Sequence, residues 1–148
     1  MVAAAGWAYP GSPSDWSLTT TPNPGTSMLG SPARMWIISA PSITTPEQLK
    51  GKIGSVNRFG SISEMGLRLS LRRLGIDPEK DVKIVPAGGN PERLASISRG
   101  ISQFTIMSEP FVREAERLGL RNLVSMANLK IPLHGNGLVT LEANIKSK

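Results

Sequence analysis

The residues with the clearest potential for chemistry lie in a short loop, N-R-F-G, and directly after it. Arg58 supplies a cation, Phe59 an apolar ring, and Gly60 a break before a predicted helix. The first amide groups of a helix have no acceptor within it, and a serine at its start can cap one of them. Free amide donors beside a cation suit an anion or a strongly polar ligand. The candidate ligand-binding residues of this loop are Arg58, Phe59, Gly60, Ser61 and Ser63.

Two further loops follow predicted strands. Gly88, Gly89 and Asn90 come after the apolar run Val82–Val85, and Glu109 comes after Phe104–Met107. Ligands of open α/β sheets bind outside the carboxyl ends of the strands, so these loops should meet the first one at the same edge. Simpler interpretations stay open: Arg58 as a solvent-facing cation, the glycine pair as a turn with positive φ, and Glu109 as an acid that favours a helix start.

The chain shows no convincing catalytic or metal-binding motif. Its one histidine, His134, has no carboxylate at metal-ligand spacing, and the sequence contains no cysteine. The glycine-containing loop before Ser61 matches neither the dinucleotide fingerprint nor a P-loop. We therefore expect no catalytic residues, no bound metal and no cofactor.

The helix after Gly60 shows how the candidate loops are held. Glu64, Arg68 and Arg72 fall on one narrow strip at helical spacing, which leaves a wide apolar arc. We expect most of this helix to be buried, and strand and helix patterns to alternate as far as a last strand at 138–141. This alternation predicts the α/β class, with a mainly parallel sheet covered by helices on both faces. The apolar arc is formed by Ile62, Met65, Leu67, Leu69, Leu71 and Leu74.

Composition divides the chain into three parts. Residues 1–33 are rich in Pro, Gly, Ser and Thr and hold a single charged side chain, so we expect a mostly disordered leader. Residues 34–130 should form the α/β unit, and residues 131–148 a hinge and a shortened return strand. The net charge of +6 comes from scattered basic residues beside acidic ones, which predicts a solvated surface and no nucleic-acid partner.

Several segments together resemble a known family. They are I-T-T-P-E-Q-L-K-G-K-I-G from Ile43, R-F-G-S from Arg58, L-G-I-D-P-E-K-D-V from Leu74, G-G-N-P-E-R from Gly88, and S-E-P from Ser108. In this order they resemble the nitrate/sulfonate/taurine-type substrate-binding proteins of ABC importers, and also the related pyrimidine synthases of thiamine biosynthesis.

The resemblance implies one lobe of a type II periplasmic-binding-protein-like fold. It further implies a periplasmic, non-enzymatic protein that carries a small-molecule solute such as an organic anion to a membrane permease, although the first residues show no secretory signal. Because the second lobe is not recognisable, we expect a partial chain whose exposed apolar face would allow self-association. The alternatives are a fragment of a pyrimidine-synthase-like enzyme and the effector-sensing domain of a regulator.

Overall fold

The computed structural model describes residues 17–20, 26–32, 34–131 and 133–141. The chain divides into two compact units, of which unit 1 comprises Met1–Ala33 with Pro132–Lys148 and unit 2 comprises Arg34–Ile131. Unit 2 is the α/β part and carries every candidate ligand-binding residue.

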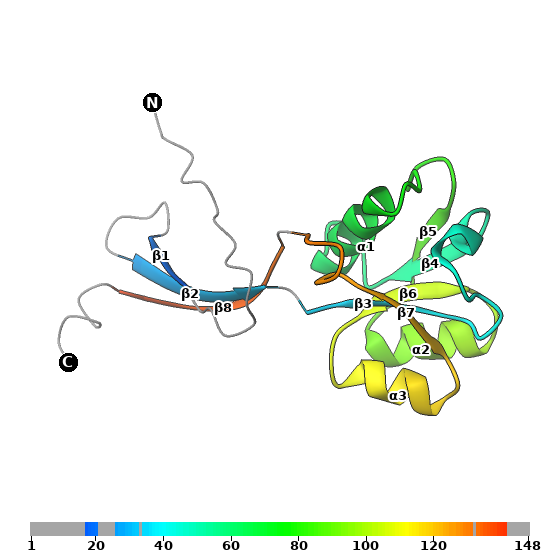
Figure 1. The fold of residues 1–148 in the computed structure, drawn as a ribbon. Helices are drawn as coiled ribbons and strands as arrows, with labels where there is room; N and C mark the ends of the chain where they lie inside the picture. Colours follow the sequence, from blue (N-terminus) through cyan, green and yellow to red (C-terminus); the bar gives the residue numbers. More distant parts are fainter. Residues whose placement is uncertain (1–16, 21–25, 33, 132, 142–148) are drawn as a thin grey trace. The chain divides into compact units, whose positions relative to one another are not determined.

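A five-stranded sheet forms the centre of unit 2 (Figure 1), with the strand order β5-β4-β6-β3-β7. β4 lies between β5 and β6 and runs parallel to both, whereas β3 runs antiparallel to both β6 and β7. Four strands therefore point the same way, and their carboxyl ends share one edge with the start of β3. The strands are β3 (Trp36–Ser39), β4 (Ile53–Val56), β5 (Lys83–Pro86), β6 (Phe104–Met107) and β7 (Arg121–Ser125).

Helices cover both faces of this sheet, as Figure 1 shows for α1 (Ile62–Arg73) on one side and α2 (Asn90–Ser98) with α3 (Phe111–Arg117) on the other. A short 3-10 helix, Pro46–Leu49, precedes β4. The core beneath α2 and α3 is built from buried aliphatic side chains that alternate with residues facing α1. Its members are Ile38, Leu94, Ile97, Met107, Val112, Ala115 and Leu120.

Unit 1 contains a three-stranded antiparallel sheet in the order β1-β2-β8. β1 (Ser17–Thr20) pairs with β2 (Thr26–Pro32), which pairs with β8 (His134–Leu141). Two strands thus lie in the segment for which the sequence predicted no regular structure, because strand pairing supplies partners that the leader's composition does not reveal. The last strand is also longer than predicted, and it pairs with β2 outside the five-stranded sheet.

The α/β class and the helices on both faces are confirmed. The sheet is mixed, since β3 is reversed relative to its neighbours, and a period-two pattern carries no information on strand direction. Among the residues described, no helix combines the length and apolar character needed to cross a membrane. The division of the chain into leader, lobe and hinge stays a prediction.

Candidate functional site

The loops after β4 and β5 lie side by side at the carboxyl edge of the sheet. The N–H of Ala87 donates to the carbonyl of Val56 at 2.8 Å, and the N–H of Gly88 donates to the carbonyl of Asn57 at 3.1 Å. These bonds extend the β4–β5 pairing into the loops. The structure therefore brings the group Arg58–Ser63 close to the group Gly88–Asn90, as the sequence predicted from strand order.

The start of α1 is capped by its own side chains. The Ser61 Oγ accepts from the Glu64 N–H at 3.3 Å, and it also donates to the Arg58 carbonyl at 2.6 Å. The Glu64 carboxylate accepts from the Gly60 N–H at 2.6 Å. Ser63 is buried and accepts from the Asn57 N–H at 3.0 Å. This network makes the loop before α1 rigid.

This capping corrects the expectation that the start of α1 is an open, purely positive corner. Glu64 places a carboxylate there, and the N–H groups of Gly60 and Glu64 already have acceptors. Among the described residues, the N–H groups of Ile62 and Ser63 have no hydrogen-bond acceptor, and of these two residues Ile62 is exposed whereas Ser63 is buried. The sequence alone did not predict that Glu64 would accept from the Gly60 N–H, because helical spacing already pairs Glu64 with Arg68. The structure shows that ion pair as well, at 2.8 Å.

The Glu64 carboxylate should make stability depend on pH. The N–H of Gly60, and secondly Arg68, lower the pKa of Glu64 below the usual value of 4.5. A lowered pKa in the folded state adds stability that is present above the unfolded value and is lost as the pH falls through the folded value. The Glu64→Gln variant should therefore be less stable than the parent chain at neutral pH and approach it under acid conditions.

Urea unfolding at a series of pH values measures this difference. Glu114→Gln, which removes an exposed carboxylate from α3, controls for the loss of an acidic side chain from a helix. A Glu64→Gln deficit that stayed constant from neutral to strongly acid pH would show that the carboxylate's charge does not stabilise the loop.

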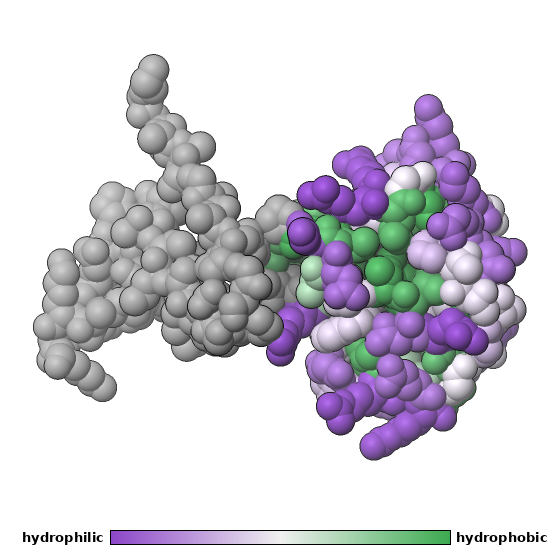
Figure 2. Space-filling model, in the orientation of Figure 1, coloured by the Kyte–Doolittle hydropathy of each residue, from purple (hydrophilic) through white to green (hydrophobic). Residues whose placement is uncertain are grey.

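An apolar surface surrounds the start of α1. Phe59, Ile62 and Met65 are 57%, 41% and 52% exposed, respectively. The prediction that Ile62 and Met65 are buried is therefore wrong: the sheet covers only the arc of α1 around Leu67 and Leu71, and these side chains lie outside it. Figure 2 shows apolar surface gathered around α1 and the neighbouring strands, bordered by hydrophilic side chains. Arg58, also exposed, lies next to Phe59 in the chain.

The loop after β5 is held by Arg93, a residue to which the sequence analysis assigned no role. Gly89 is the N-cap of α2, and it has no side chain that could make a capping bond. Gly88 has a φ of +89°, as the turn interpretation required. The Asn90 Oδ1 instead accepts from Arg93, which is buried. The sequence contained a signal for the burial of Arg93: this residue lies four residues before the core residue Ile97, so both share one face of the helix.

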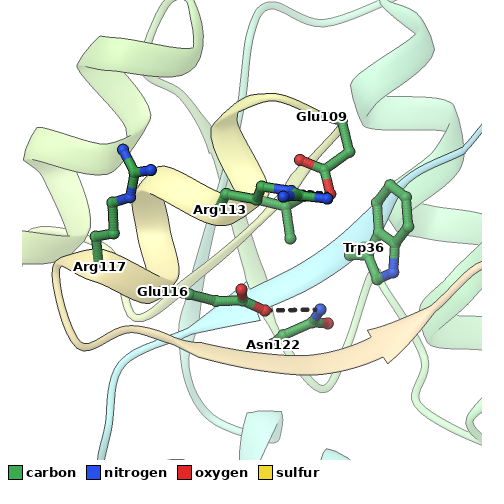
Figure 3. A pocket seen from close by; sticks show the side chains of 7 residues that line it. Trp36, Glu109, Arg113, Glu116, Arg117 and Asn122 are labelled. Atoms are coloured by element: carbon green, nitrogen blue, oxygen red, sulfur yellow. Dashed lines mark hydrogen bonds and ion pairs between the residues drawn. The ribbon is translucent and has the colours of Figure 1, made fainter.

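Glu109 belongs to a different group of side chains. It lines an open groove of about 590 Å³ on α3 and the adjoining strands, with Trp36 at the start of β3. Figure 3 shows Glu109 near Arg113, at 3.7 Å, and Glu116 accepting a bond from Asn122 at 3.3 Å. Within the described part of the chain, no hydrogen bond or ion pair joins Glu109 to the other candidate residues. The groove's charges compensate one another locally, so we do not assign it to the same site.

A metal site is not visible in the described residues, where no three His, Asp or Glu side chains gather to hold an ion. The site therefore consists of two free amide donors, one exposed cation, an apolar surface and a rigid glycine loop. Such a surface can hold a small molecule that has a negatively charged end and an apolar end.

Comparisons with known proteins bear on the fold. No protein-family profile and no curated protein sequence matches the chain. Solved structures do. The periplasmic aliphatic sulphonate binding protein SsuA from Escherichia coli superposes with a TM-score of 0.64 at 19% identity over 83% of this chain. The alkanesulfonate-binding protein SsuA from Xanthomonas axonopodis pv. citri, bound to MOPS, gives 0.59 at 16% identity over 81%. PhnD1 from Prochlorococcus marinus, in complex with methylphosphonate, gives 0.57 at 10% identity over 81%.

These matches span 39%, 43% and 51% of the three proteins, so this chain corresponds to about half of their length or less. The likeness extends over most of the present chain, and it agrees with the family resemblance of the sequence. The chain has the α/β fold of the corresponding part of these three proteins.

Proposed function

We propose that this chain provides one wall of a binding site for small organic oxyanions, as the solute-binding component of an ABC importer. The observation that carries the proposal is the carboxyl edge of the sheet. There Arg58 and the free amides of Ile62 and Ser63 lie beside the exposed Phe59 and Met65. A sulfonate or phosphonate group would accept from the amides and pair with Arg58, and its organic part would cover the apolar side chains.

The similar structures support this choice of solute, since one is an aliphatic sulphonate binding protein and the others hold MOPS and methylphosphonate. By the same analogy we propose that the chain acts by binding and not by catalysis, in the periplasm, and delivers its solute to a membrane permease. The proposed ligand contacts are Arg58, Phe59, Gly60, Ser61, Ser63, Gly88, Gly89 and Asn90. Glu109, the remaining candidate from the sequence, is not included because it lines the separate groove on α3.

Thermal-shift measurements with methanesulfonate, MOPS and methylphosphonate test the proposal. We expect each anion to raise the melting temperature of the full chain, and Arg58→Ala to remove most of this shift while leaving the melting temperature without ligand nearly unchanged. Arg72→Ala is the matched control, because Arg72 is an exposed arginine at the opposite end of α1. Equal shifts for both variants would show that Arg58 does not contact the anion.

The apolar surface at the start of α1 has a second proposed use, which is contact with another copy of the chain. Sedimentation velocity at increasing protein concentration separates the two uses. A concentration-dependent dimer that the Met65→Ser variant dissolves would support self-association, whereas a monomer that binds the anions would support the solute site alone.

A further inference from the structure

Arg93 is a buried arginine at the base of the candidate site. It lies in the first turn of α2, and its side chain is largely inaccessible, with 5% of the residue exposed. Arginine is rarely buried unless it is paired, because removing its charge from water is costly. The residue therefore needs either a local structural reason or a functional one.

The hydrogen bonds of Arg93 give part of the structural reason. Its Nε donates to the Gly89 carbonyl at 3.3 Å, and its Nη2 donates to the Asn90 Oδ1. Its Nη1 donates to the Ile106 carbonyl and, at 3.4 Å, to the Thr105 Oγ1. Thr105 in turn donates to the Ser55 carbonyl at 2.7 Å. One side chain thus ties the loop after β5 to the end of β6 and, through Thr105, to β4.

The charge of Arg93 is not neutralised by these bonds. All four acceptors are uncharged, and among the described residues Arg93 makes no ion pair. Its neighbour in the chain, Glu92, is exposed to solvent and forms no ion pair with it, although the Glu92 charge partly opposes the effect of burial on the pKa of Arg93. Burial lowers the pKa of Arg93 to about 10, so the guanidinium still carries its charge at neutral pH. A guanidinium has five N–H donors, and the bonds above use four, which leaves one on Nη2.

We infer that Arg93 is the positioning residue of the proposed solute site and the source of its preference for anions. Its fork holds Gly89 and Asn90 against the end of β6. Its charge, which has no ion-pair partner, makes the carboxyl edge more positive and opposes the carboxylates of Glu64 and Glu92, which also lie at this edge. This inference rests on the proposed function and adds that solute charge, beyond shape, decides selection. Buried charge acts over a longer distance than the exposed Arg58, because solvent screens it less.

A charge series of ligands tests this role. Isothermal titration calorimetry of the full chain would compare dimethyl sulfone, methanesulfonate and the methylphosphonate dianion, which are similar in shape and carry zero, one and two negative charges. Arg93→Met should weaken methanesulfonate binding by about tenfold and the dianion by more, since loss of a buried charge costs affinity in proportion to the charge it meets. Dimethyl sulfone should be weakened least, because it loses only the positioning of the loop. Arg93→Lys should keep the charge ranking, although its binding is weaker than in the parent chain.

The control is Arg99→Met, which removes an exposed arginine at the other end of α2 and should leave all three affinities unchanged. If Arg93→Met does not fold, Arg93→Lys alone still tests the inference, because loss of the charge ranking in that variant contradicts it. Equal weakening of all three ligands would mean that Arg93 only supports the loop, and the inference would be wrong while the proposed function stands. A parent chain that binds none of the three would overturn both.

Discussion

Gly54→Ala should destabilise unit 2 by about 1–3 kcal/mol, a large cost for the addition of one methyl group. A Cβ at this position would lie 2.5 Å from Cε2 and 2.6 Å from Cζ of Phe104. Gly54 and Phe104 are direct partners in the β4–β6 pairing, and Phe104 is fully buried, so the ring has no free space to enter. Urea unfolding of the full chain, followed by the circular dichroism of the helices, measures the loss.

Two further variants separate this clash from a general effect of replacing a buried glycine. Gly66→Ala also adds a buried Cβ, but its nearest neighbour is the flexible Met35 side chain at 3.1 Å, and alanine favours the helix. We expect a small change there. Combining Gly54→Ala with Phe104→Leu should cost less than the sum of the single changes, because the smaller side chain removes the overlap. If the free-energy changes of the two single variants simply added in the double variant, the Phe104 ring and the new methyl group would not overlap.

Leu67→Ala should cost about 2–5 kcal/mol, since it leaves a cavity beneath α1 in a close-packed core. Leu67 is fully buried, whereas Met65, two residues earlier in the same helix, is 52% exposed. Met65→Ala should change the free energy of unfolding by less than about 0.5 kcal/mol, as is usual for surface positions. The pair compares two apolar deletions in one helix at positions that differ mainly in burial.

The measured quantity is again the free energy of unfolding in urea, with equal slopes required for a valid comparison. Similar costs for Leu67→Ala and Met65→Ala would contradict the orientation of α1 on the sheet. They would also indicate that Met65 is buried, so that the exposed apolar surface on which the proposed solute site depends would not exist. The same two variants thus examine the packing of α1 and the composition of the site.

Local signals allowed good prediction of where elements lie and where loops end. A serine caps α1 as expected, and of the two candidates it is Ser61. β6 has the predicted bounds, and the loops after β4 and β5 meet because their strands are parallel neighbours. These features depend on short-range chemistry, namely capping oxygens, glycine turns and apolar runs. Such chemistry acts between residues that are close in the chain, so the sequence displays it.

The charge of the site could not be predicted in the same way. Glu64 has two local partners available, Arg68 and the Gly60 N–H, and only the folded loop shows that it serves both. Arg93 resembles a solvent-facing helix residue beside Glu92, and its burial depends on β6, which lies more than ten residues further along the chain. Long-range packing determines which polar side chains lose contact with water.

The amino-acid sequence by itself determined the α/β class, the order of strands and helices within unit 2, and the loops that carry the candidate site, because each follows from spacing and turn chemistry within a few residues. Only the tertiary structure decided the reversed direction of β3, the exposure of Ile62 and Met65, and the burial of Arg93 at the base of the site. Those properties depend on which surfaces meet, and a helix or strand pattern states that a face is apolar without stating what covers it.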